Sequence, residues 1–185
     1  MPVYVAMLRG VNVAGHNLVK MAELRGLLET LVFEQCQTYI QSGNLVFSAA
    51  KGSEAEIAAK IAKGMAKKFG FEPGVAVRTA TEMGKVIERN PFVKMKGVDV
   101  TTLHVTFLSG EPDTAAVKKL AELAAAGEEF RGSGREIYLY CPNGYGNTKL
   151  SNNAIEKVLG VSATTRNWKT VNKVREMALQ CGKPE

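Results

Sequence analysis

The sequence is poor in the residues from which catalytic and metal sites are usually built. It has two histidines, His16 and His104, and three cysteines, Cys36, Cys141 and Cys181. An odd number of widely separated cysteines argues against a disulfide framework and against a zinc site, which needs closely spaced ligands. We therefore expect reduced thiols in an intracellular, cytoplasmic protein without a metal or another cofactor.

Long apolar runs are also missing. No stretch approaches the roughly 20 residues needed to cross a bilayer. The first residues show no basic segment followed by an apolar one, so we expect neither a membrane span nor a signal peptide. The net charge is +6, and much of the excess lies between Lys149 and Arg175. This excess is typical either of a surface that attracts phosphates or of a solvated basic face.

Hydrophobic periodicity predicts alternating strands and helices in the first part of the chain. Two capping boxes, Ser53 with Glu56 and Thr79 with Glu82, mark the starts of two helices. The dipeptide Asn90-Pro91 ends the last of these helices, because a residue before proline is pushed out of the α region. We predict strands over 3–9, 36–40, 45–48 and 74–78, and helices over 20–31, 53–69 and 79–89.

The same order of elements returns after residue 100. Apolar and polar residues alternate over 103–107, which predicts a half-buried strand with His104 opposite the core face. Asp113 and Ser151 are placed to begin helices, and Gly160 to end one. We predict further strands over 129–131, 136–141 and 163–165, a glycine-containing loop over 142–149 and a last helix carrying Trp168.

Both halves follow the order β-α-β-β-α-β-α. This is the split-βαβ, ferredoxin-like arrangement with one more helix. The predicted class is α+β, with two ferredoxin-like βαββαβ halves over residues 1–91 and 98–185, each with an added C-terminal helix.

Three motifs carry a resemblance to a known family. They are Met7-Leu8-Arg9-Gly10-Val11-Asn12-Val13, Thr38-Tyr39-Ile40-Gln41-Ser42-Gly43-Asn44 and Thr164-Thr165-Arg166-Asn167-Trp168-Lys169-Thr170-Val171. Together they resemble the family named domain of unknown function 1697, over nearly the whole chain. The resemblance implies a duplicated ferredoxin-like fold and implies no activity.

The chain departs from the family pattern at a few positions. Ala14 and His16 stand where the family usually shows glycine and lysine, and Val32 replaces the glycine common before Phe33. A non-basic pair, Asn147-Thr148, precedes Lys149. A histidine that is neutral at pH 7 would hold an anion less firmly than a lysine.

The loop over 142–149 is the first candidate site. Small residues before a helix N-terminus expose backbone N–H groups to a phosphate, and Lys149 adds a positive charge. The spacing of a Walker motif is absent. The alternative is a polar loop whose glycines only permit turns.

Two further candidates come from the motifs. The first is a set of polar residues at strand ends: Arg9, Asn12, Gln41, Ser42 and Asn44. Because the first and third strands of a βαββαβ sheet are central neighbours, Arg9 and Asn44 are candidates for close approach. The second is Arg166 with the expected N-cap Asn167, which together would bind an anion or a carboxylate. In each case the alternative is a local structural role.

These candidates lead to three hypotheses. We predict binding of a phosphate-bearing ligand at a cleft between the two halves, lined by at least two of Arg9, Asn44 and Arg166. The first alternative is single-stranded nucleic-acid binding on an open sheet face, since 3–8 loosely fits the first strand of RNA-recognition motifs. The second alternative is a small cofactor-free enzyme, although neither histidine has a recognisable nucleophile partner.

Overall fold

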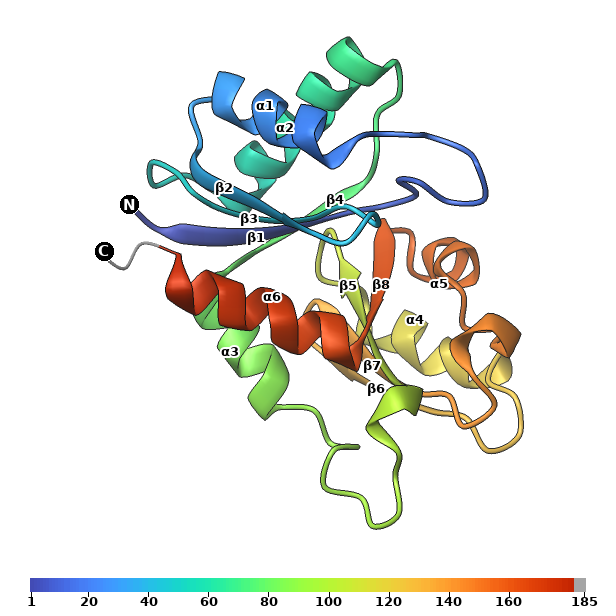
Figure 1. Ribbon diagram of the computed structural model, residues 1–185. Helices are drawn as coiled ribbons and strands as arrows, with labels where there is room; N and C mark the ends of the chain where they lie inside the picture. The colour runs from blue at the N-terminus through green and yellow to red at the C-terminus, as the bar shows by residue number, and fades with distance from the viewer. Residues whose placement is uncertain (182–185) are drawn as a thin grey trace. The chain divides into compact units, whose positions relative to one another are not determined.

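Two four-stranded antiparallel sheets form the core of the computed structural model, which describes residues 1–181 (Figure 1). The strand orders are β2-β3-β1-β4 and β6-β7-β5-β8, so the two sheets repeat one topology. The predicted α+β fold with duplicated ferredoxin-like halves is confirmed. The first run of elements is β1 (Val3–Leu8), α1 (Met21–Thr30), β2 (Glu34–Tyr39), β3 (Asn44–Ser48), α2 (Glu54–Phe69), β4 (Val75–Thr79) and α3 (Ala80–Glu88).

The second run has the same order after a short 3₁₀ turn. It comprises β5 (Leu103–Leu108), α4 (Thr114–Lys119), β6 (Glu129–Ser133), β7 (Glu136–Tyr140), α5 (Asn152–Leu159), β8 (Ala163–Asn167) and α6 (Trp168–Gln180). The chain divides into two compact units, one of Met1–Lys85 with Lys173–Glu185 and one of Val86–Asn172. Each unit contains one of the sheets.

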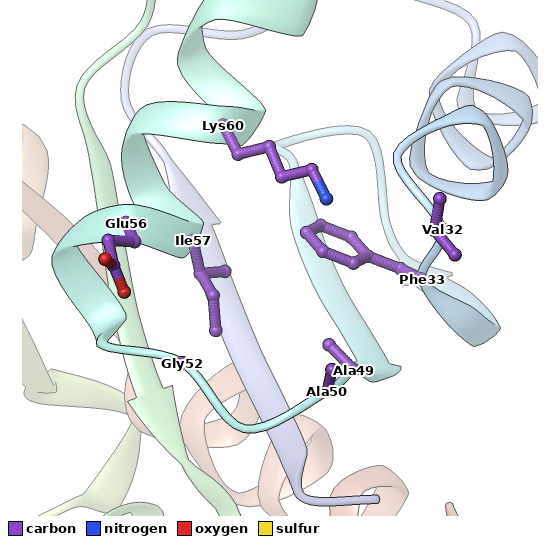
Figure 2. Close-up of a pocket in the computed structure, with 8 residues that line it drawn as sticks. All are labelled: Val32, Phe33, Ala49, Ala50, Gly52, Glu56, Ile57 and Lys60. Atoms are coloured by element: carbon purple, nitrogen blue, oxygen red, sulfur yellow. The ribbon is translucent and has the colours of Figure 1, made fainter.

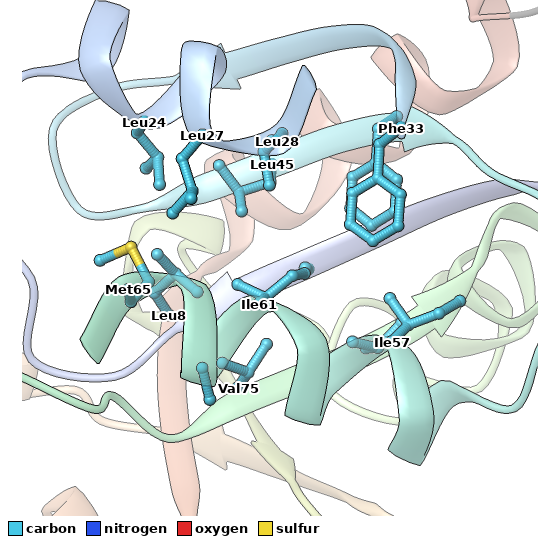
Figure 3. Close-up of a cluster of buried hydrophobic side chains, with 14 of the residues drawn as sticks. Leu8, Leu24, Leu27, Leu28, Phe33, Leu45, Ile57, Ile61, Met65 and Val75 are labelled. Atoms are coloured by element: carbon cyan, nitrogen blue, oxygen red, sulfur yellow. The ribbon is translucent and has the colours of Figure 1, made fainter. Parts of the chain in front are cut away.

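The core of the first unit lies between its sheet and the helices α1 and α2 (Figure 3). Leu24 and Leu28 of α1 and Ile61 and Met65 of α2 are fully buried against the strands. The predicted capping box holds the start of α2, since the Glu56 N–H donates to Ser53 Oγ and the Ser53 N–H donates to Glu56 Oε2. Burial of these apolar side chains fixes the face that each helix presents.

Helix α1 ends in a Schellman motif. The Phe33 N–H donates to the Leu28 carbonyl (3.2 Å) and the Val32 N–H to the Glu29 carbonyl (3.0 Å). This motif requires a left-handed residue, usually glycine, at the position that Val32 occupies with φ +65°. A glycine before Phe33, which the resemblance to the family implies, would therefore have a conformational reason.

The edge strand β2 is irregular. Its pairing with β3 shifts register between Glu34 and Gln37, and Gln35 has φ +52°. An extra residue in one strand of an antiparallel pair is a β-bulge, which bends the strand and increases its twist.

Strand β5 of the second unit is buried more completely than we predicted. Thr106 and Leu108 are fully buried together with Leu103, Val105 and Phe107. Leu108 belongs to the cluster formed with Leu120, Ile155 and Leu159, so the face that carries it is a core face too. The prediction of a half-buried strand is therefore wrong. This central strand is buried on both faces of the sheet.

Within residues 1–181, no helix combines the length and the apolar character needed to span a membrane.

Candidate functional site

The strand-end residues of the first unit lie together. Strands β1 and β3 are antiparallel with Met7 opposite Asn44, so Arg9 and Asn44 lie at the same end of the sheet. The Leu8 N–H donates to the Gly43 carbonyl (2.9 Å) across this end. The two residues, which the sequence left as candidates for close approach, thus come from neighbouring strands at one end of the sheet.

Asn12 ties the loop after β1 to the turn between β2 and β3. Its Nδ2 donates to the carbonyls of Val19 (3.0 Å) and Gln41 (2.7 Å), and its Oδ1 accepts from the Val19 N–H (2.8 Å). Asn12 and Ala14 both have positive φ, near 50°. The amide of Asn12 is therefore engaged in holding backbone.

Asn44 has a similar role in the turn itself. Its side chain is fully buried, and its Nδ2 donates to the Tyr39 carbonyl (3.0 Å) and to Ser42 Oγ (3.1 Å). These bonds close the Gln41–Asn44 turn and place Ser42 beside it. The amides of this end of the sheet hold its loops in place.

The glycine-containing loop of the second unit contains one turn of 3₁₀ helix, Tyr145–Asn147. Asn147 Nδ2 donates to the Asn143 carbonyl (2.8 Å) across this turn. Lys149 follows with an exposed side chain, and Ser151 caps α5 by accepting from the Ala154 N–H (3.3 Å). The loop is thus ordered, and it carries its cation just before a helix N-terminus.

Tyr145 joins this loop to the strands of its own unit. Its ring stacks on His104 of β5, with centroids 4.8 Å apart and planes at 24°. Its contribution to the pKa of Arg166 opposes the effect of burial, although Arg166 pairs with Val105 and so lies on the opposite face of β8 from His104. We call the set of His104, Tyr145, Lys149, Arg166 and Asn167 the Tyr145 cluster. It unites two of the predicted candidates, the loop over 142–149 and the Arg166-Asn167 pair.

Arg166 is the buried cation of the cluster. Only 9% of the residue is exposed, and its Nη1 donates to Thr164 Oγ1 (2.8 Å) and to the Thr165 carbonyl (3.0 Å). Burial lowers the pKa of Arg166 to about 10, and Tyr145 opposes this shift. The guanidinium therefore remains charged at neutral pH.

Asn167 ends β8 and begins α6, as its sequence predicted. Its Oδ1 accepts from the Thr170 N–H (2.8 Å), so it is the N-cap of the helix. Asn167 is exposed, and its side-chain nitrogen is a hydrogen-bond donor that the capping bond does not use. Asn167 pairs with His104 across β5 and β8, which places this donor beside the stacked rings.

His104 is the histidine of the cluster, and a chain of hydroxyl groups lies next to it. Burial lowers the pKa of His104, while a hydrogen bond with the Thr102 backbone opposes the shift. Its buried Nδ1 has no hydrogen-bond partner within the described residues. Next to it on the same face of β5, Thr106 Oγ1 lies 2.7 Å from Thr165 Oγ1, which donates to Asn152 Oδ1 (2.7 Å).

The sequence pattern placed His104 opposite the core face and did not single out Tyr145. These residues are 41 positions apart, and no local pattern joins them. In residues 1–181, no three histidine, cysteine or acidic side chains gather in a way that would hold a metal ion.

Comparisons with known proteins agree with the fold. The conserved bacterial protein SP0830 from Streptococcus pneumoniae has a similar structure, with a TM-score of 0.76 and 24% sequence identity over 96% of this chain and 98% of that one. No curated protein matches. The family described as "Protein of unknown function (DUF1697)" matches residues 1–138, which include the first two motifs but not the third. The chain belongs to the DUF1697 family.

Proposed function

We propose that the protein binds a phosphate-bearing ligand at the Tyr145 cluster. The observation that carries this proposal is the stacking of Tyr145 on His104. It holds the loop that contains Lys149 against the end of β8, where Arg166 and Asn167 lie. His104 and its β8 partner Asn167 share the face of the sheet that Tyr145 covers, whereas Arg166 pairs with Val105 and is buried on the opposite face.

The chemistry of the face that Tyr145 covers suits an anion. Arg166 is buried on the opposite face of β8, and its charge acts through the sheet, where it is screened less than in water. Lys149 supplies an exposed charge, and Asn167 Nδ2 supplies a neutral donor. Helix α5 begins three residues after Lys149, at Asn152, and its first N–H groups add the positive end of a helix dipole.

The nucleic-acid alternative receives less support. Single-stranded binders need an accessible sheet face with aromatic rings. The residues of β1 from Tyr4 to Leu8, and all of β5 except His104, are buried.

If the protein were an enzyme, its cysteines would not provide a reactive nucleophile. Burial raises the pKa of Cys36 and of Cys141 to about 11, so both thiols are protonated at neutral pH. A protonated thiol is a poor nucleophile.

A binding experiment tests the proposal. A panel of phosphorylated metabolites, each with its unphosphorylated counterpart, is screened by thermal shift, because a bound ligand raises the apparent stability. Isothermal titration then compares variants with the best compound. Asp caps helices as well as Asn does, so Asn167→Asp keeps the fold but replaces a donor by a negative charge. We expect this variant to bind at least about tenfold more weakly, a loss of roughly 1.4 kcal/mol.

Two lysines provide the matched comparison. Lys149→Met should weaken binding about fivefold, since an exposed ion pair contributes up to about 1 kcal/mol. Lys157→Met, at the other end of α5, should leave binding unchanged. Equal effects of the two lysine changes, or equal binding of the unphosphorylated compounds, would contradict the proposal.

A further inference from the structure

A second feature, in the first unit, is an open cavity of about 360 Å³ at the entrance to α2 (Figure 2). Its apolar surface comes from Val32, Phe33, Ala49 and Ile57, and its rim carries Glu56 and Lys60. The volume lies at the lower end of the range for small-molecule sites, which are usually apolar with a few polar groups.

The cavity lies at the end of a column of aromatic rings. Tyr4 stacks on Phe47 with centroids 6.0 Å apart, and Phe47 stacks on Phe33 at 4.5 Å with planes only 9° apart. Phe33 is the last ring of this column and the one that lines the cavity. Another planar ring placed beyond Phe33 would continue the stack, an arrangement that aromatic groups favour.

Lys60 provides a charge at the same place. Its Nζ lies 5.2 Å from the centroid of the Phe33 ring, a cation–π distance. Figure 2 shows the ammonium group directed toward Phe33 and Val32, with the Glu56 carboxylate away from it. Glu56 is engaged with Ser53, and Lys60 forms no ion pair or hydrogen bond within residues 1–181. The cavity therefore offers an aromatic surface beside a cation that no carboxylate neutralises.

Val32 lines one side of the cavity in a conformation that is unfavourable for valine. It is 77% exposed and has φ +65°, a conformation that is unfavourable for a β-branched residue. Its side chain gains little from packing in return. Strain of this kind is often found at ligand sites, and here it places an apolar side chain on the cavity.

From these observations we propose that this cavity binds a planar aromatic carboxylate. The ring of the ligand stacks on Phe33 as the next member of the column, in contact with Ile57 and Val32. The carboxylate pairs with Lys60 Nζ, whose flexible side chain moves aside from the Phe33 ring. The site is independent of the Tyr145 cluster and holds a different class of ligand.

Naphthalene-2-carboxylate is the probe for this site. Its binding is followed by chemical shift changes in the labelled full-length protein, with two analogues that each lack one feature. Cyclohexanecarboxylate lacks the aromatic ring, and naphthalene-2-methanol lacks the charge. We expect saturable binding of the probe with shifts at Phe33, Ile57 and Lys60, and at least fivefold weaker binding of either analogue.

Two lysine variants distinguish the effect of the Lys60 charge on binding from an effect on the fold. Lys60→Met keeps an unbranched, flexible side chain that can also move aside from the Phe33 ring but removes the charge, and should weaken binding of the probe about fivefold. Lys63→Met removes another exposed lysine of α2 that does not line the cavity, and should change nothing. Phe33→Leu should abolish binding; if it fails to fold, the lysine pair still decides. No saturable binding to the unchanged protein, equal binding of an analogue, or an unaltered affinity in Lys60→Met would overturn the proposal.

Discussion

Single residues in the left-handed region are where this chain departs most clearly from simple sequence rules. Val32 occupies the position of a Schellman motif that glycine usually fills. Because valine pays a steric cost there, the residue stabilises α1 less than a glycine would. The position therefore offers a test of how much local strain the fold carries.

We predict that Val32→Gly stabilises the protein. Removing the left-handed strain gains about 1–2 kcal/mol, and the greater backbone entropy of glycine takes back about 0.5–1 kcal/mol. The expected net gain is roughly 0.5–1 kcal/mol in the free energy of unfolding, measured by urea titration. Val93 is also exposed and lacks a positive φ, so Val93→Gly should destabilise the protein. Destabilisation by Val32→Gly would contradict the strain argument.

Some features of single residues could not be predicted from the sequence. The end of α1 was placed within one residue, but its motif was not recognised because valine gives no stop signal. The stacking of Tyr145 on His104 joins two distant segments, and only the folded chain brings them together. Asn167, by contrast, was correctly expected as an N-cap, since capping depends on residues only three positions apart.

At the scale of elements, local signals gave most of the architecture. The capping boxes at Ser53 and Thr79 form as predicted, and the turn over Gln41–Asn44 joins β2 to β3. The alternating pattern of β5 was misleading, because Thr106 is polar but buried and bonded to Thr165. A hydroxyl group that finds a partner in the next strand is buried without penalty, and alternation then fails as a guide.

The β2–β3 turn provides an element-scale prediction. Gly43 has φ +81°, and a Cβ added to it would lie 2.9 Å from Leu8 Cβ. Gly43→Ala combines backbone strain with a clash against the central strand, so we expect a loss of about 2–4 kcal/mol. Gly10 has φ +72° with nothing within 4 Å of its added Cβ. Gly10→Ala should therefore cost only the strain, about 1–2 kcal/mol, and equal losses in chemical denaturation would disprove the role of the clash.

At the scale of the whole molecule, two thiols and one tyrosine hydroxyl make the free energy of unfolding fall at alkaline pH. Burial, with a smaller effect of a nearby glutamate, raises the pKa of Cys36 and of Cys141 from 9.0 to about 11. Burial also raises the pKa of Tyr138. The unfolded chain loses these protons before the folded one does, so the free energy of unfolding must fall as pH rises from about 9 to 11.

We predict a loss of about 1–2 kcal/mol between pH 8 and pH 10, after allowing for solvent screening of the partly exposed Cys36. Urea titrations at both pH values measure it. The Cys36→Ala, Cys141→Ala double variant should start less stable but show a smaller fall with pH. A fall of the same size in the double variant would show that the thiols are not responsible.

The bulge in β2 has a consequence for the protein at high concentration. An edge strand offers unpaired backbone groups, and a regular one can act as a template on which strands of other molecules add. In β2 the bulge at Gln35 interrupts the regular spacing of these backbone groups between Glu34 and Gln37. A strand arriving from a neighbouring molecule would form one or two bonds and then lose register. The bulge therefore disfavours aggregation through the edge of this sheet.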